Sequence, residues 1–327
     1  MNGMARVGSI IALSALVLPI ALATVTEAQT WPQRTVKFVV PLGPGSGVDL
    51  GARLFADGLS KKWGHPVVVE NMPGGDGIVA ITNYLTANDS HVLLMAPAST
   101  FTAHPYQKEK LPYNPNDVIP IARVSNTIVS YSVPASSSIK TMQELFADAK
   151  ANPGKINWAS ATGMLDFVLS GYLKGAGLQF QSVPYRSPVQ AAPDLAEGRI
   201  QFMIAAYAIV RPLVDAGKVR MIAITNKARA PNLPNVPTTT EAGFPQLATD
   251  GLVGLFSIKD TPNDLRNRIA ADIKDVATAD PNIGMSLAQS GQLLNFGTTA
   301  EFVTAIDEQK AQAAAVAKVL GIKAAGQ

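Results

Sequence analysis

The stretch VKFVVPLGPGSGVDLGARLFADGLSKKW, residues 36–63, decides the fold. It begins with five β-favouring residues and continues through the glycine- and proline-rich segment 41–47. After this segment, Leu50, Leu54, Phe55 and Leu59 recur at helical spacing. This order predicts a strand, a tight turn and a helix.

The alternation of strands and helices continues to the C-terminus. Strands are predicted at 66–70, 91–96, 130–133, 156–160, 182–185, 200–205, 219–225 and 251–258, and helices at 78–87, 141–151, 166–175, 189–197 and 208–217, with 264–321 mostly helical. The short connections predict parallel sheets covered by helices on both faces. Because single cores stop growing at roughly 250–300 residues, we expect the 327 residues to form two α/β lobes.

The composition excludes several classes of protein. With 47% apolar and 16% charged residues, the chain has ample material for a core, so global disorder is excluded. A net charge of +3 is too small to indicate a nucleic-acid-binding surface. The absence of cysteine excludes disulfides, thiolate metal sites, a cysteine nucleophile and lipid attachment through an N-terminal cysteine.

Residues 1–28 have the layout of a secretory signal peptide. Arg6 supplies the positive charge, an apolar stretch follows from Val7 to Ala23, and Thr26-Glu27-Ala28 offers a cleavage site with small residues. The alternative is a transmembrane anchor. It is disfavoured because the stretch is interrupted by Gly, Ser and Pro and lacks a basic flank. We therefore expect a soluble mature protein in the periplasm that is not lipid-anchored.

Three loops with small and hydroxyl residues follow predicted strands. They are Gly43 to Gly47, Ala98 to Phe101 with Ser99 and Thr100, and Ser160 to Met164. Backbone N–H groups in such loops, with a helix N-terminus behind them, can bind an anion. Each loop alone could equally be a tight turn. Together, at the carboxyl ends of strands, they favour a small anionic ligand.

Catalytic and metal-binding candidates are few. The three histidines, His65, His91 and His104, have no partner at the spacing of a metal site or a catalytic triad. No Gly-x-Ser-x-Gly nucleophile elbow is present. We therefore expect no catalytic residues, no metal and no cofactor.

Three charged residues near the loops each have two interpretations. Asp49 is either a cap-like charge in the first turn of a helix or a residue that holds the loop in shape, and a structural role is favoured because the helix dipole stabilises a carboxylate there. Asp166 has the same two interpretations. Arg186 is either a surface charge or a fork for a ligand carboxylate.

Short motifs along the whole mature chain resemble a known family. In order they are Trp31-Pro32, Val39-Val40-Pro41 with Pro44-Gly45 and Gly47 to Asp49, Val67 to Asn71 with Pro73-Gly74, Leu111 to Pro115, Asn152 to Lys155 with Trp158 to Ser160, Val183-Pro184-Tyr185, Ala216 to Lys218 with Ala223 to Thr225, and Leu233 to Thr238. The combination resembles the Bug-type (TctC-like) extracytoplasmic solute-binding proteins of tripartite tricarboxylate transporters.

The resemblance implies a two-lobed, periplasmic-binding-protein-like α/β fold. Each lobe would be a mostly parallel sheet covered by helices, with the ligand cleft between the lobes. The first lobe would take residues 29–130 and 251–327, and the second lobe residues 131–250. Such a protein is expected to be a monomer that closes over its ligand and delivers it to membrane permease subunits.

The resemblance also implies which residues bind the ligand. A carboxylate would be held by backbone amides and hydroxyls of the first loop, and the other two loops would complete the pocket. The expected ligand-binding residues are Leu42, Gly43, Pro44, Gly45, Ser46, Gly47, Val48, Asp49, Ser99, Thr100, Ala161, Thr162, Gly163, Met164, Arg186, Ala205 and Tyr207.

Departures from the family pattern bear on the ligand. Val48 lacks the hydroxyl that is usual at its position, and Ala205 stands where many members have Asp, so a partner for a ligand amine is absent. Arg186 could meet a second carboxylate in a bidentate manner. These residues favour a dicarboxylate or an aromatic acid over an amino acid.

Three functions remain open from the sequence. The first is a receptor that delivers a carboxylate to a permease. The second is a co-sensor that presents a solute to a membrane histidine kinase, which the sequence cannot separate from the first. The third is a periplasmic enzyme on the same scaffold, which the lack of a nucleophile–base pair disfavours.

Overall fold

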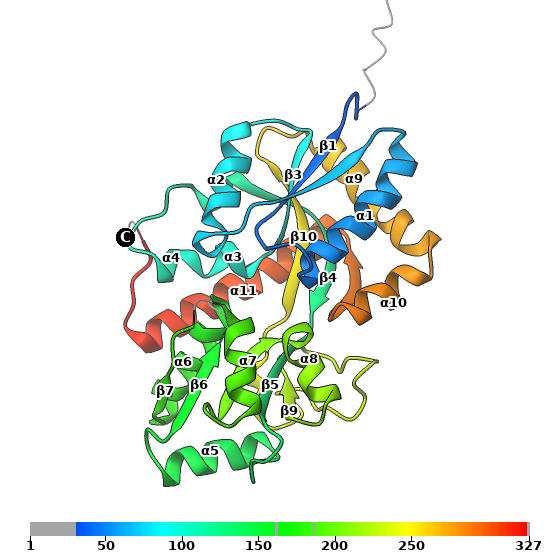
Figure 1. The fold of residues 1–327 in the computed structure, drawn as a ribbon. Coiled ribbons are helices and arrows are strands. Elements are labelled where there is room, and N and C mark those ends of the chain that lie inside the picture. Colours follow the sequence, from blue (N-terminus) through cyan, green and yellow to red (C-terminus); the bar gives the residue numbers. More distant parts are fainter. Residues whose placement is uncertain (1–30, 161–162, 186, 326–327) are drawn as a thin grey trace, which may run out of the picture.

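A computed structural model describes residues 31–160, 163–185 and 187–325, and in these ranges the strands form two sheets (Figure 1). The sheet of the first lobe has the spatial order β11 (Gln292–Gly297), β4 (Val118–Thr127), β10 (Gly251–Ile258), β3 (Val92–Pro97), β1 (Val36–Val40) and β2 (Val67–Asn71). The sheet of the second lobe has the order β7 (Phe180–Ser182), β6 (Ile156–Ser160), β8 (Phe202–Ala206), β5 (Val129–Pro134) and β9 (Val219–Ile224). The two-lobed α/β class is therefore confirmed.

Both sheets are mixed. β1 pairs in parallel with β2 and β3, and β6 pairs in parallel with β7 and β8, as the short βα connections predict. The strands that run between the lobes pair antiparallel: β4 and β10 in the first lobe, β5 and β9 in the second. The expected parallel pairing is therefore found within the βαβ units. The strands that carry the chain from one lobe to the other and back run in opposite directions, so they pair antiparallel.

Helices cover the sheets and connect their strands. They are α1 (Gly47–Trp63), α2 (Ile78–Ala87), α3 (Ser99–Thr102), α4 (His104–Gln107), α5 (Met142–Ala151), α6 (Met164–Ala176), α7 (Pro188–Ala196), α8 (Tyr207–Asp215), α9 (Asn263–Ala279), α10 (Asn282–Gln289) and α11 (Thr299–Leu320), with short 3₁₀ turns η1 (Gly75–Gly77), η2 (Pro115–Asp117) and η3 (Pro245–Leu247). Among the described residues, no helix is both long and apolar enough to cross a membrane.

Helix α1 follows directly from its sequence. The Ser46 hydroxyl caps the helix by accepting the Asp49 N–H, and Gly64 ends it in the left-handed conformation with φ 69°. The side chains of Phe55 and Leu59 are buried on its core face, as their spacing predicts. Leu50 shares this spacing, but its side chain is 41% exposed because the buried stripe of α1 begins at Val48 instead.

The chain crosses between the lobes at two strand connections. β4 passes into β5 through the single buried residue Ile128, and the segment 225–250 leads from β9 back to β10. The division of the chain into lobes at residues 130 and 250 stays a prediction, and these crossings are consistent with it.

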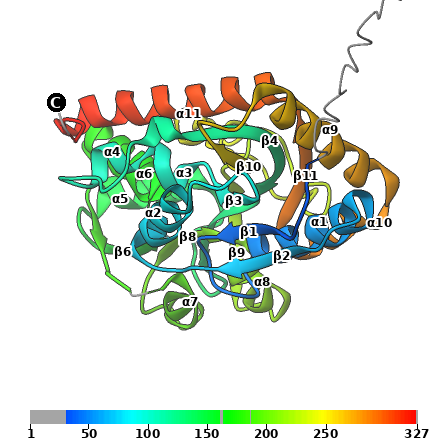
Figure 2. The same cartoon turned by 90° about the horizontal axis from the view of Figure 1, so that it is seen from above.

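Helix α11 lies along both lobes (Figures 1 and 2). Phe302 and Ile306, near its start, pack in an apolar cluster of the first lobe. Ala313 and Ala317, nearer its end, pack in the main cluster of the second lobe. Between these two contacts, Gln309 accepts a hydrogen bond from the Thr102 hydroxyl at 2.9 Å and donates one to the Asp250 carbonyl at 3.2 Å. The helix therefore joins the two lobes beside the second crossing.

Several elements differ from the sequence-based expectation. β4 was not predicted because Pro120 interrupts its pattern; the structure places this proline beside a register shift, where a missing N–H is tolerated. β11 lies within residues 264–321, where the sequence predicts mostly helix. β7 ends at Ser182, where the predicted strand began, and residues 99–107 contain the short helices α3 and α4.

Candidate ligand-binding site

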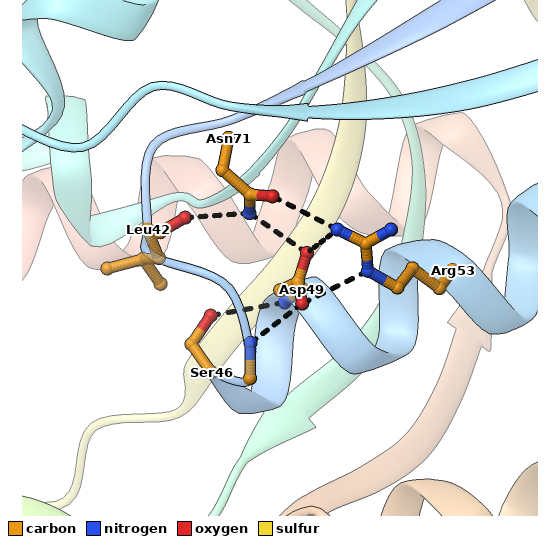
Figure 3. A network of polar contacts seen from close by, with 6 residues as sticks. Leu42, Ser46, Asp49, Arg53 and Asn71 are labelled. Carbon is orange, nitrogen blue, oxygen red and sulfur yellow. Dashed lines mark hydrogen bonds and ion pairs between the residues drawn. The ribbon is translucent and has the colours of Figure 1, made fainter.

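The first loop, between β1 and α1, is held by a polar network around Asp49 (Figure 3). The Asp49 carboxylate is buried and accepts the Gly45 N–H at 2.8 Å and the Asn71 side-chain amide at 2.9 Å. Arg53, one helical turn on, approaches the same carboxylate at 3.0 Å. Asn71 also donates to the Leu42 carbonyl at 2.9 Å, so one amide joins both ends of the loop.

This network fixes the charge state of Asp49 and the donors that the loop can offer. Burial opposes ionisation, but hydrogen bonds from Arg53, Gly45 and Asn71 outweigh it and hold the pKa of Asp49 below its usual range. The Gly45 N–H is engaged with Asp49. The Ser46 hydroxyl oxygen accepts the Asp49 N–H, which leaves its proton free to be donated.

The pKa of Asp49 gives a testable pH dependence of stability. A carboxylate whose pKa is lower in the folded than in the unfolded state stabilises the fold above the unfolded pKa, near 3.8, and loses this contribution as the pH falls below it. We expect the difference in unfolding free energy between the wild type and Asp49→Asn to stay constant between about pH 7 and 5. It should shrink below about pH 4. Urea denaturation at these pH values measures it.

Asp166 provides a control with the opposite sign. Burial raises the pKa of Asp166, and a hydrogen bond from Ser160 counters this only in part. Asp166→Asn should therefore stabilise the protein at pH 7, and the gain should vanish as the pH falls below the ordinary carboxyl pKa. Parallel pH profiles for the two variants would contradict the opposite signs assigned to the two pKa shifts.

The second loop begins α3 and packs against a glycine-rich turn. Ser99 and Thr100, both partly exposed, are the first two residues of this four-residue helix. A Cβ added to Gly77 would lie only 2.3 Å from the Thr100 Cγ2 atom and 3.3 Å from the Pro41 Cβ atom. The turn after β2 therefore supports both the first and the second loop.

The third loop lies in the second lobe. Ala161 and Thr162, like Arg186, fall outside the described residues. Gly163 has a φ of +93° that favours glycine, and its carbonyl accepts the Gln107 side-chain amide at 2.9 Å. Because Gln107 belongs to α4, this bond joins the two lobes.

Besides Asp49, four expected site residues have buried side chains. Val48 packs in the core of the first lobe, and Met164, Ala205 and Tyr207 pack in the clusters of the second. Burial accordingly raises the pKa of the Tyr207 hydroxyl. Such residues can offer a ligand their backbone groups, whereas Leu42, Pro44 and Gly45 lie exposed on the first loop.

The turn 290–292, which joins the first loop to the second lobe, is missing from the residues predicted from the sequence. A Cβ added to Gly47 would lie 2.7 Å from the Ser290 carbonyl, and one added to Gly291 would lie 3.0 Å from the Ala208 N atom. The Gly291 carbonyl accepts the Ile128 N–H at 2.9 Å, and the Ile128 carbonyl accepts the Tyr207 N–H at 2.8 Å. The available signal was Gly291 itself, a glycine just past a helix.

The arrangement has the chemistry of an anion-binding site. Loops with backbone N–H groups and hydroxyls stand at the carboxyl ends of β1, β3 and β6, and the turn 290–292 lies next to the point where the lobes meet. In the described part of the chain, no group of three or more His, Asp or Glu residues could hold a metal ion. The fold and these loops define a two-lobed binding protein whose loops stand at the carboxyl ends of strands in both lobes.

Comparison with known proteins places the chain in a family. Residues 51–322 match the model of the tripartite tricarboxylate transporter family receptor, TctC. The UPF0065 protein in the gbd 5′ region of Cupriavidus necator is 33% identical over 292 residues, covering 87% of this chain and 86% of that protein. The chain therefore belongs to the TctC receptor family.

Solved structures agree with this assignment. The periplasmic binding protein BugD has a TM-score of 0.74 at 25% identity, over 90% of this chain and 99% of that one. MatC of Rhodopseudomonas palustris, solved with bound malate, has a TM-score of 0.74 at 25% identity, over 88% and 99%. The resemblance to Bug-type and TctC-like proteins is thus confirmed.

Proposed function

We propose that this protein is a periplasmic receptor that captures a small organic carboxylate between its lobes and delivers it to a tripartite tricarboxylate-type permease. The observation that carries the proposal is the first loop, a hydroxyl-bearing turn at the N-terminus of α1. A helix N-terminus with free donors attracts a carboxylate. MatC, a relative of the same fold, was solved with malate, a dicarboxylate.

The network around Asp49 supports this role of the loop. Asp49 places a negative charge behind the loop, which by itself would repel a carboxylate. Arg53, 3.0 Å from the carboxylate, balances that charge. The loop can then keep its shape without repelling an anionic ligand.

The second lobe bears on the class of ligand. Ala205, at the end of β8, supplies no acidic side chain for a ligand amine. Arg186 is a candidate partner for a second carboxylate. We therefore propose a dicarboxylate or an aromatic acid as the ligand, in preference to an amino acid.

Closure of the hinge is the proposed signal to the permease. A ligand that contacts loops of both lobes makes more contacts in the closed than in the open arrangement, and these additional contacts stabilise the closed one. The contact between Gly291 and Ala208 at the hinge supports this proposal, because it lets the lobes approach each other closely beside the first loop.

Isothermal titration calorimetry with succinate, malate and benzoate, against aspartate and glutamate, tests the ligand class. We expect a dicarboxylate or benzoate to bind with one site per chain. At about 100 times its Kd, the ligand should add roughly 2.7 kcal/mol to the unfolding free energy. Tight binding of aspartate or glutamate, without any response to the other acids, would refute the ligand class. Uptake of the bound acid by vesicles that contain the permease tests delivery.

A further inference from the structure

A cavity lies at the hinge, and the first loop is not part of its lining. It has a volume of about 740 Å³, and residues of both lobes line it. One wall comes from α10 and β11, including Met285 and Ala288, and the other from the segment after β9, including Lys227 and Pro231. In Figure 1 this yellow-green segment extends beneath α10. The loops assigned to the carboxylate do not contribute to the lining.

The cavity has an apolar body and one polar end. Met285, Ala288, Leu293 and Leu294 supply the apolar surface. The polar end lies where the chain crosses between the lobes, at Asn126 of β4 and at Asp250, just before β10. This division suits a small molecule with an apolar body and a single polar group.

The polar end offers acceptors of hydrogen bonds. Asn126 is only 5% exposed, and its side-chain oxygen has no hydrogen-bond partner among the described residues. One oxygen of Asp250 accepts the Lys227 N–H at 3.1 Å. The Asn126 oxygen is fully buried, so the acceptor that an occupant reaches at this end of the cavity is the Asp250 carboxylate.

The local charge favours a cation. The Lys227 ammonium lies 2.6 Å from the Glu308 carboxylate, so its charge is already balanced. Lys227, Glu308 and Asp250 together carry one positive and two negative charges. The excess negative charge resides on Asp250, which lines the cavity. A carboxylate is repelled by this arrangement, whereas an ammonium group is attracted.

We propose that this cavity is a second binding site, which takes a small organic amine in its ammonium form with an apolar body. The ammonium group meets the Asp250 carboxylate, and the apolar body packs on α10 and β11. The site does not depend on the carboxylate cleft. Because its walls belong to both lobes, an occupant contacts both sides of the hinge.

Titration of the purified protein with hexylammonium, and with hexanoate as the matched anion, tests the site. We expect hexylammonium to bind with one site per chain and hexanoate not to bind in this cavity. Ala288→Trp, which fills the cavity from α10, and Asp250→Asn, which removes the charge, should each weaken hexylammonium binding by at least about tenfold. Asn282→Trp, on the same helix outside the lining, should have no effect.

Separate readouts keep the outcomes distinct. An unchanged midpoint of urea unfolding shows that Ala288→Trp is folded, and the exposed Met285→Trp fills the cavity with little risk to folding. The proposal is overturned if hexylammonium fails to bind, if it binds Ala288→Trp and Met285→Trp as tightly as the wild type, or if hexanoate competes with it.

Discussion

Replacing Asp49 by Ala should weaken carboxylate binding by about tenfold or more and lower the free energy of unfolding by about 2–3 kcal/mol. The substitution removes the acceptor of the Gly45 N–H and of the Asn71 amide. It also leaves Arg53 without its buried partner. Because the Arg53 side chain is itself half-exposed, water recovers part of that loss. Urea denaturation and calorimetry measure the two effects.

Asp57→Ala is the matched control for this experiment. Asp57 lies on the same helix and also pairs with a cation four residues on, Lys61, at 2.6 Å. Both partners are exposed, so the pair contributes little, and we expect a change of less than about 0.5 kcal/mol and unaltered binding. Equal effects of the two substitutions would show that Asp49 has no special role in the loop.

Asp49→Asn separates the shape of the loop from its charge. An amide oxygen can still accept the Gly45 N–H, but it no longer balances the guanidinium of Arg53. The loop should keep most of its shape and gain net positive charge near the ligand. We therefore expect Asn to weaken carboxylate binding less than Ala does.

The first three strands were predictable because each of their signals is local. The segment 36–40 is β-favouring throughout, Gly45 supplies a positive φ of 80°, and Ser46 caps the helix that follows. No contact with a distant residue is needed to specify these elements. The same local signals are the basis for predicting an anion site at the first loop.

Elements that depend on distant partners were not predictable. β4 contains Pro120 and lies between β10 and β11, so its strand character comes from pairing with residues more than 100 positions away. Helix α11 was expected as a helix, but its alanine-rich end gives no sign of a lobe. Val316 packs against Gly171 of α6 so closely that a Cβ added to Gly171 would lie 2.7 Å from the Val316 Cγ1 atom. This contact places the end of α11 on the second lobe.

The candidate site shows the same division. The role favoured for Asp49, a structural one, agrees with its network, and its spacing from the turn was the available signal. The Asn71 contact crosses 22 residues of sequence and needs the parallel pairing of β1 and β2, which brings Asn71 beside Val40. The turn 290–292 lies about 240 residues from the first loop, and only the folded chain brings them together.

Gly47→Ala should cost about 1–3 kcal/mol of stability and weaken carboxylate binding, because it pushes the first loop away from the turn 290–292. The added Cβ would lie 2.7 Å from the Ser290 carbonyl and 2.7 Å from the Gln292 amide nitrogen. The carbonyl belongs to the backbone and cannot rotate away. Gln292 is buried with hydrogen bonds to Ser125 and Thr127, so it has little freedom to move either.

Gly43→Ala in the same loop separates crowding from the general cost of losing a glycine. A Cβ on Gly43 would have no atom within 4 Å, and its φ lies outside the range that favours glycine. This variant should therefore keep the stability of the wild type or gain slightly from a stiffer unfolded chain. If Gly43→Ala and Gly47→Ala lose carboxylate affinity equally, flexibility of the loop controls binding. If only Gly47→Ala does, the contact between the first loop and the turn 290–292 holds the site in its binding geometry.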